Sequence, residues 1–349
     1  MWGVIRGHDR QREQFEQAVR RDRLAHAYLF VGAEGIGKRR FAEFLAQCLL
    51  CEQRPGGRLE ACGSCPACIQ VQAETHPDLI RIALPEGKRE LPVELMIGSR
   101  DKRGQEGLCH ELAMRPMRAD RRIAIVDDAQ TMNAESANAL LKTLEEPPPG
   151  SLLILLTPVI DAVLPTIRSR CQPITFAPLS EQDVAELIVT LGWVSDEQTA
   201  REAAALAAGS LVTARQLLQP ELRDLRSHLF RVLESPQLDP LAASAAILAG
   251  IDELGGDAAA QRVHASWAIR FCIESLRSRM RELSAAGDAD DREGGGEVEV
   301  EVELIDSVAA QLDRCFDAEL QLQRSMPIPL CLEGLFDGLT RIRRGFVEV

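Results

Sequence analysis

Apolar residues follow two alternating patterns along the first half of the chain. Short runs rich in Val, Ile and Leu predict β-strands, and the segments between them place apolar residues at helical spacing. Because strand and helix alternate, we expect an α/β fold in which helices cover a parallel sheet. The predicted strands are residues 27–32, 79–84, 122–127, 151–157 and 173–176, and the clearest helices between them are 39–50 and 134–145.

Two stretches within these predicted strands, 123–126 and 152–156, are apolar at every position. A half-buried strand alternates apolar and polar residues, whereas a continuously apolar strand is buried on both faces. We therefore expect these two strands in the middle of the sheet.

After Pro178 the strand pattern ends, and helical spacing continues almost to residue 349. Ser180 is a typical N-cap for the first of these helices. Since 349 residues exceed what one hydrophobic core usually holds, we expect an α/β domain, a small helical domain and a larger helical domain. Their predicted ranges are 1–177, 178–220 and 221–349; the last is marked by Leu222, Leu225, Leu229 and Leu233 and by a long helix over 261–283.

Residues 285–303 interrupt the pattern of the third domain. They combine acidic residues with several glycines, followed by alternating Glu and Val. Low hydrophobicity with high charge predicts a mobile acidic insertion between two helices.

The charge balance restricts how the chain would hold nucleic acid. Lys and Arg number 40 and Asp and Glu 53, a net charge of −13, which is the wrong sign for binding through the overall field. An aromatic content of 4% argues against a stacking platform for bases. DNA contact would therefore need a local patch. The candidate patch is Arg115, Arg118, Arg121 and Arg122, for which a solvated loop is the alternative.

A glycine-rich loop follows the first predicted strand and leads into a helix, as in a phosphate-binding loop. Its glycines, which let backbone N–H groups converge on phosphate oxygens, are Gly32, Gly35 and Gly37. Lys38 would reach the β and γ phosphates, but the next position, where such loops carry Ser or Thr to ligate Mg²⁺, is Arg39. We therefore expect a degenerate loop that keeps its fold without catalysis and binds nucleotide weakly or structurally.

An acidic pair ends the predicted strand 122–127. Asp127 stands where a Walker B aspartate holds Mg²⁺. Asp128 replaces the glutamate that usually follows and is one methylene shorter. Tandem acids at a strand end are often solvated caps, but together with Arg39 they indicate an impaired nucleotide site.

Ten cysteines in a secreted chain would suggest disulfides, but the first ten residues contain no apolar signal region. The longest apolar stretch, 151–160, is too short to span a bilayer. We therefore expect a cytoplasmic protein without a membrane partner, whose reduced thiols bind metal or fill the core.

Four of the cysteines fall within residues 51–68, and three of them are two residues apart. This spacing lets consecutive thiolates face one ion, which a more distant fourth thiolate completes as a closed tetrahedral shell. The pattern predicts structural Zn²⁺, with an unmetallated loop or an iron–sulfur cluster as alternatives and His76 as a competing ligand. The predicted ligands are Cys51, Cys62, Cys65 and Cys68; the others, expected in the core, are Cys48, Cys109, Cys171, Cys272, Cys315 and Cys331.

Taken together, these residues resemble the clamp-loader AAA+ family of bacterial DNA polymerase III. The resemblance covers about residues 3–220, and the helical remainder fits the collar domain of that family loosely. It rests on the phosphate loop, on the cysteine module directly after its helix and on three further motifs. These are Thr75-His-Pro-Asp78, Asn138-Ala-Leu-Leu-Lys-Thr-Leu-Glu-Glu-Pro-Pro148 and Pro165-Thr-Ile-Arg-Ser-Arg-Cys171.

The resemblance implies an AAA+ phosphate-loop sheet with an inserted zinc module, a small helical lid domain and an all-α collar domain for oligomerisation. It also implies roles for single residues. Arg170, in the Ser-Arg-Cys motif, is implied to be an arginine finger that reaches the ATP site of the adjacent subunit, with a surface salt bridge as the alternative. Thr157 takes the sensor-1 position, or simply ends the strand. Val212 aligns with a phosphate-sensing arginine of active members, for which Arg215 is the alternative.

Within this family, active gamma/tau subunits carry Ser or Thr after the lysine and the delta-prime subunit often does not, so Arg39 and Asp128 favour the delta-prime branch. The resemblance then implies a largely non-hydrolysing stator with structural Zn²⁺ and doubtful ATP/Mg²⁺ binding. Its partners would be gamma/tau and delta subunits in a hetero-pentamer of the DNA-directed DNA polymerase III holoenzyme, which loads the sliding clamp on primer-template DNA at the nucleoid.

Two alternatives remain open from the residues. One is an active ATPase similar to gamma/tau, which would have to tolerate Arg39 beside Mg²⁺. The other is a DNA-binding protein built on the zinc module, with a vestigial nucleotide fold.

Overall fold

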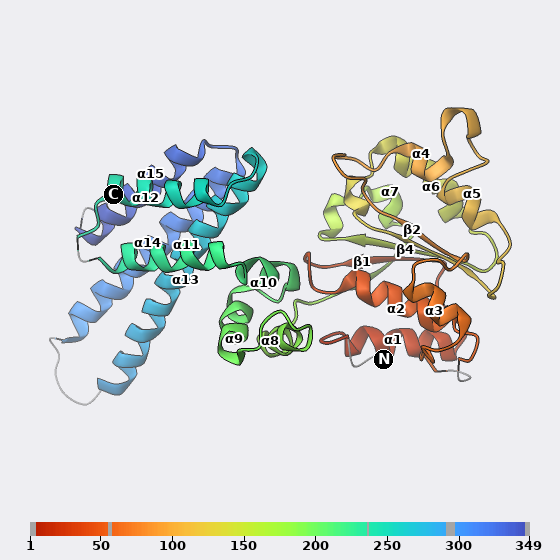
Figure 1. The fold of residues 1–349 in the computed structure, drawn as a ribbon, viewed down its shortest axis with the longest axis horizontal. Helices are drawn as coiled ribbons and strands as arrows, with labels where there is room; N and C mark the ends of the chain where they lie inside the picture. The colour runs from red at the N-terminus through yellow and green to blue at the C-terminus, as the bar shows by residue number, and fades with distance from the viewer. Residues whose placement is uncertain (1–4, 55–57, 236, 291–296, 346–349) are drawn as a thin grey trace. The chain divides into compact units, whose positions relative to one another are not determined.

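The structure is a computed structural model and describes residues 5–54, 58–235, 237–290 and 297–345. The chain divides into two compact units, Met1–Arg215 and Gln216–Val349. The first unit contains the sheet and a group of small helices, and the second is helical throughout its described part (Figure 1). The finer division into three domains at 177 and 220 stays a prediction.

Five parallel strands form the sheet in the order β2-β3-β4-β1-β5. The two continuously apolar runs lie in β3 and β4, and each of these strands pairs on both sides, as predicted. The α/β parallel-sheet prediction is therefore confirmed. The strands are β1 (Ala27–Val31), β2 (Leu79–Ile82), β3 (Arg122–Val126), β4 (Ser151–Thr157) and β5 (Gln172–Thr175).

Helices cover both faces of this sheet, and each face has its own hydrophobic core (Figure 1). Alternate residues of β1 point to opposite sides, so Tyr28 and Phe30 join one core and Ala27 and Leu29 join the other. The first core packs against α1 (Asp9–Arg20), α2 (Lys38–Leu50) and α3 (Pro66–Gln72), and the second against α4 (Val93–Ile97), α5 (Leu108–Ala113), α6 (Ala134–Glu145) and α7 (Pro165–Arg168).

In the described part of the sheet domain, three short 3₁₀ turns lie in the connections. They are η2 (Arg100–Lys102), η3 (Ala129–Thr131) and η4 (Ile160–Ala162). The last two follow the ends of β3 and β4, so the chain turns sharply at the same edge of the sheet where the predicted nucleotide residues lie.

The helices of the predicted lid domain are α8 (Glu181–Thr190), α9 (Glu197–Leu206) and α10 (Leu211–Leu217). Ser180 caps α8, because its Oγ accepts a hydrogen bond from Asp183 N at 3.0 Å, as the sequence predicts. Asp196 caps α9 in the same way through Thr199 N at 2.8 Å.

The second unit consists of five helices in its described part. The leucines at helical spacing, Leu222 to Leu233, are buried on one face of the first of them. The expected insertion 285–303 is helical as far as Asp290 and again from Glu297, and residues 291–296 lie outside the described ones. The helices are α11 (Pro220–Glu234), α12 (Pro240–Glu253), α13 (Ala258–Asp290), α14 (Glu297–Gln323) and α15 (Ile328–Arg343).

Candidate functional site

The phosphate loop joins β1 to α2 at the carboxyl edge of the sheet. Two of its glycines leave no room for a side chain: a Cβ at Gly35 would lie 2.2 Å from Ser210 Oγ, and one at Gly32 would lie 2.5 Å from the carbonyl oxygen of Phe176. Gly35 also has a φ of +76°, which other residues rarely adopt. The loop conformation therefore depends on glycine at both positions.

Lys38 is the first residue of α2 and is 9% exposed. Its Nζ donates hydrogen bonds to the carbonyl oxygens of Gly32 at 2.6 Å and Ala33 at 2.7 Å. Burial lowers the pKa of Lys38, and the nearby carboxylate of Glu34 opposes this shift. Two of the three ammonium N–H groups thus hold the loop's own backbone.

Arg39 pairs with the acid predicted to hold magnesium. Its Nη1 lies 3.2 Å from Asp127 Oδ2, and its Nε donates to Glu43 Oε1 at 3.4 Å. Burial raises the pKa of Asp127, and the Arg39 guanidinium is the main opposing influence. Because the ligating hydroxyl is replaced by a cation that already pairs with Asp127, these residues do not fit a Mg²⁺ site of the phosphate-loop type.

A pocket of about 780 Å³ lies at this edge of the sheet, between the phosphate loop, the ends of β3 and β4 and the start of α10. Gly32 is not among its lining residues but is held beneath them by Lys38. The predicted residues that line the pocket are Gly35, Gly37, Lys38, Arg39, Asp127, Asp128, Thr157 and Val212.

The side chains of Asp128 and Thr157 form local hydrogen bonds. Asp128 has a left-handed backbone with a φ of +54°, and its Oδ1 accepts a bond from Gln130 Nε2 at 3.3 Å. Thr157 is 1% exposed, and its Oγ1 donates to the carbonyl oxygen of Val159 at 2.9 Å. Both side chains therefore help to shape the turns that follow β3 and β4.

The lid contacts the phosphate loop directly. Leu211 N donates to the carbonyl oxygen of Gly35 at 2.9 Å, at the start of α10. Among the described residues that line the pocket, α10 contributes Val212 and not Arg215. The Arg215 guanidinium instead lies 5.8 Å from the centroid of the Trp193 ring. The side chain that α10 contributes to the pocket is therefore apolar.

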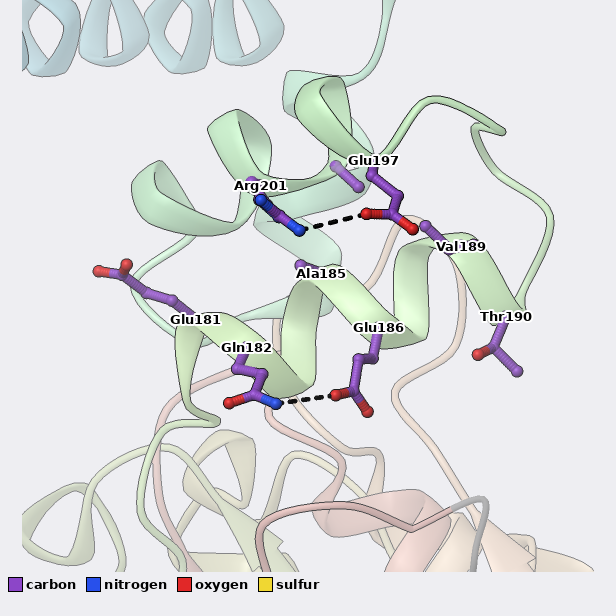
Figure 2. Close-up of a pocket in the computed structure, with 9 residues that line it drawn as sticks. Glu181, Gln182, Ala185, Glu186, Val189, Thr190, Glu197 and Arg201 are labelled. Carbon is purple, nitrogen blue, oxygen red and sulfur yellow. Dashed lines mark hydrogen bonds and ion pairs between the residues drawn. The ribbon is translucent and has the colours of Figure 1, made fainter.

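A second hollow of about 720 Å³ lies between α8 and α9, and none of the predicted site residues lines it. Figure 2 shows its two ion or hydrogen-bond pairs, Gln182 with Glu186 and Arg201 with Glu197. Each pair joins residues one turn apart on a single helix, so these interactions stabilise the helices themselves.

The four predicted cysteine ligands converge in the module between α2 and α3. Their Sγ atoms all lie within 4.8 Å of one another, with separations of 3.9 Å for Cys51–Cys65 and for Cys62–Cys68. A tetrahedral ion with metal–sulfur bonds of about 2.3 Å needs sulfur separations of about 3.8 Å. The cluster therefore fits a metal ion bound by four thiolates.

Backbone N–H groups support the thiolate form within this cluster. Cys62 Sγ accepts from Cys65 N at 3.3 Å, and hydrogen bonds from the backbone of Ser64 and Cys65 lower the pKa of Cys62 to about 6. Burial raises the pKa of Cys51 and Cys68. His76 is not part of the group found among the described residues, and its Nδ1 accepts a hydrogen bond from Asp78 N at 3.1 Å.

Arg170 lies between α7 and β5 with its side chain 35% exposed. Its Nη2 donates to Glu145 Oε1 at 2.6 Å, and its Nη1 donates to the carbonyl oxygen of Thr166 at 3.0 Å and to Ser169 Oγ at 3.2 Å. The guanidinium is therefore at the surface and held at three points.

The candidate arginine patch is divided by the structure. Arg122 is 5% exposed, and its Nε donates to Asp78 Oδ1 at 3.3 Å, so it is not part of a surface patch. Arg115 and Arg118 are exposed and Arg121 is half-buried. Asp78 also accepts hydrogen bonds from the backbone N–H groups of Met117, Arg118 and Ala119.

Sequence reasoning missed three of these contacts. Asp78 and Glu145 were noted as motif members without a contact partner, and the packing of Ser210 against Gly35 was not expected. Their partners are 25 or more residues away in sequence, so local spacing carries no signal for them. The one clue available in the sequence was that Glu145 and Arg170 belong to two motifs of the same family.

No helix in the described part of the chain is both long and apolar enough to cross a membrane. The model of the family described as DNA polymerase III, delta subunit, matches residues 7–180. The chain is 34% identical over 240 residues to the DNA polymerase III subunit delta' of Pseudomonas aeruginosa, covering 67% of this chain and 68% of that protein.

Two further relatives extend this similarity. The DNA polymerase III subunit delta' of Escherichia coli is 33% identical over 230 residues, which is 64% of this chain and 64% of that protein. The DNA polymerase III subunit gamma/tau of Mycobacterium bovis is 34% identical over 169 residues, or 48% of this chain and 27% of that protein. On this similarity, the chain belongs to the delta-prime subunit family of the bacterial DNA polymerase III clamp loader.

Proposed function

We propose that this chain is a largely non-hydrolysing stator of the clamp loader, which supplies Arg170 to the ATP site of the adjacent subunit. The observation that carries the first half of the proposal is the pairing of Arg39 with Asp127 at 3.2 Å. In active phosphate loops, a hydroxyl and a Walker B carboxylate hold the Mg²⁺ ion that neutralises the transferred phosphate. Here one of these ligands is missing and the other is paired with a cation.

The remaining pocket residues support the same half of the proposal. Asp128 is shorter than the usual water-polarising glutamate and forms a hydrogen bond with Gln130. Val212 has no charge that could bind a phosphate, and two N–H groups of the Lys38 ammonium donate to backbone carbonyl oxygens of the loop itself. Nucleotide binding, where it occurs, is weak or structural.

The second half concerns Arg170. A guanidinium placed on a transferring phosphate stabilises the developing charge and contributes on the order of 10³–10⁵ in rate. An arginine that serves a neighbouring subunit has to be at the surface and oriented outward from a rigid support. Its partial exposure suits this role, and so do its three hydrogen bonds, two to Thr166 and Ser169 and one to Glu145 at the end of α6.

The metal in the cysteine module is proposed to be a structural Zn²⁺. Four thiolates leave no open coordination position for water or substrate, so the ion would tie the loop between α2 and α3 rather than react. Gln47 of α2 supports this module, because its Nε2 donates to the carbonyl oxygen of Cys68 at 3.2 Å.

The proposed partners are gamma/tau and delta subunits in a hetero-pentamer joined through the helical unit Gln216–Val349. The similarity to a gamma/tau subunit supports such an assembly of related chains. Through the complex, the chain would act on the sliding clamp and on primer-template DNA in the cytoplasm. Its net charge of −13 suits a subunit that contacts mainly proteins.

The isolated chain provides the first test. We expect no Mg²⁺-dependent ATP turnover by the purified protein, whereas Arg39→Thr should bind ATP about tenfold or more tightly when Mg²⁺ is present, because it frees Asp127 and restores a hydroxyl. Mg²⁺-dependent turnover by the unaltered chain that Lys38→Ala abolishes would establish an active ATPase instead.

A further inference from the structure

The partner of Arg170 belongs to a different motif. Glu145 is the last residue of α6, and its Oε1 accepts the hydrogen bond from Arg170 Nη2 at 2.6 Å. The other nitrogen, Nη1, is bound by the carbonyl oxygen of Thr166 and by Ser169 Oγ. Acceptors on two separate segments therefore hold one guanidinium from both sides, while its Nε is used by none of these bonds.

The backbone keeps both sides of this contact in place. The helix α6 ends at Glu145 because Pro147 and Pro148 follow. A proline disfavours helical geometry at the residue before it, which here is Glu146. The single turn of α7 packs against α6, with Leu140 and Ile167 in the same buried core. Glu145 and Arg170 thus project from elements whose separation is set by core packing.

The pair adds little to folding. The side chains of Arg170 and Glu145 are 35% and 50% exposed, and ion pairs this exposed contribute little to stability. Its physical effect is on the side chain: arginine loses much rotamer freedom when it is fixed, and a guanidinium that is already oriented loses less on reaching a phosphate.

We propose that Glu145 is a positioning residue for the arginine finger. It holds the Arg170 guanidinium in a fixed orientation at the surface, before and during its approach to the ATP site of the neighbouring subunit. Glu145 touches no nucleotide in this account and acts through Arg170 alone. The inference rests on the proposed function of Arg170, and the experiment separates the two.

The test uses the complex reconstituted with gamma/tau and delta subunits, and it measures single-turnover hydrolysis at the ATP site that adjoins this chain. Arg170→Ala should lower that rate by about 10³-fold or more. Glu145→Ala should lower it about tenfold, less than the roughly 10²-fold that a 1 Å misplacement can cost, and the ATP concentration that gives half the maximal single-turnover rate should not change. Glu146→Ala is the matched control, because Glu146 is the neighbouring exposed acid. Its backbone N–H donates to the carbonyl oxygen of Lys142, and replacing its side chain should leave the rate unchanged.

The double variant decides whether Glu145 acts through Arg170. Adding Glu145→Ala to Arg170→Ala should cause no further loss, since the interaction is already gone. Two outcomes would overturn the positioning role but not the arginine finger. One is a further loss of about tenfold when Glu145→Ala is added to Arg170→Ala, and the other is an unchanged rate for Glu145→Ala although Arg170→Ala is impaired. An unchanged rate for Arg170→Ala would instead remove the finger, and this inference with it.

Discussion

At the scale of single residues, Asp78 shows how one buried carboxylate organises a distant loop. It is 0% exposed and accepts hydrogen bonds from three successive backbone N–H groups, at Met117, Arg118 and Ala119, and from the side chain of Arg122. Burial by itself would raise the pKa of Asp78, but these hydrogen bonds outweigh it and lower the pKa. The carboxylate is thus held charged where β2 meets β3.

Asp78→Asn should therefore destabilise the sheet domain severely. The amide removes the negative charge and leaves the Arg122 guanidinium, 6% exposed, buried without a counter-ion. Breaking a buried pair on one side costs roughly 3–5 kcal/mol, which denaturant unfolding can measure. The matched control is Asp120→Asn, an exposed acid nearby, which should change stability by about 0.5 kcal/mol or less.

The pH dependence provides an independent check on Asp78. Because the pKa of Asp78 is lower in the folded state, the carboxylate stabilises the fold fully above the pKa of the unfolded chain, which is about 4. This stabilisation is lost as the pH falls through the pKa of the folded state. The difference between the unaltered chain and Asp78→Asn should then shrink in acid. A difference that is constant from neutral to strongly acidic pH would contradict the role of the charge.

The site could be predicted in part at this scale. The residue types of the phosphate loop, with Arg39 after the lysine, predict an impaired site, and this stays a prediction. The contact on which our proposal rests was not predictable: Arg39 meets Asp127, 88 positions later, only because β1 and β3 both end at one edge of the sheet. The same holds for Glu145 and Arg170, which core packing brings together.

At the scale of elements, the strands and the long helices were predicted well, and short helices were missed. The strand Ser151–Thr157 and the helix Ala134–Glu145 have the predicted bounds. By contrast, α3, α4, α5 and α7 have four to seven residues each, so they contain too few turns for a helical period. Their positions depend on the cores that they cover, which only the three-dimensional structure reveals.

The cysteine module is the element whose structure we expect to depend on a ligand. It has a small core of its own, built from Ala67 and the three buried cysteines Cys51, Cys65 and Cys68. The purified chain should contain about one zinc, and strong chelators should unfold the loop between α2 and α3, because metal binding and local folding are coupled in such sites. Metal analysis together with hydrogen exchange of this segment measures both.

Single substitutions sharpen this prediction. Cys65→Ser should lower the zinc content, whereas Cys109→Ser, a thiol that donates to the carbonyl oxygen of Ala139 outside the cluster, should leave it unchanged. A metal-free preparation with full protection of residues 58–72 would show that the module folds without an ion.

At the scale of the whole molecule, two compact units carry different tasks in this account. The unit Met1–Arg215 holds the impaired nucleotide site, the cysteine module and Arg170, and the unit Gln216–Val349 is a helical body proposed for assembly. The net charge of −13 first argued against DNA binding, and burial of Arg122 in a pair with Asp78 reduces the local basic patch further. Partner proteins, rather than nucleic acid, are therefore the expected contacts.

The central claim is that this chain contributes a residue to a neighbouring active site and no active site of its own. It is tested most directly by ATP hydrolysis in the reconstituted complex, with Lys38→Ala and Arg170→Ala compared side by side. We predict that Lys38→Ala retains hydrolysis, because Lys38 mainly holds the loop, and that Arg170→Ala loses it at the adjoining site. The opposite result, a severe loss with Lys38→Ala and none with Arg170→Ala, would contradict the account.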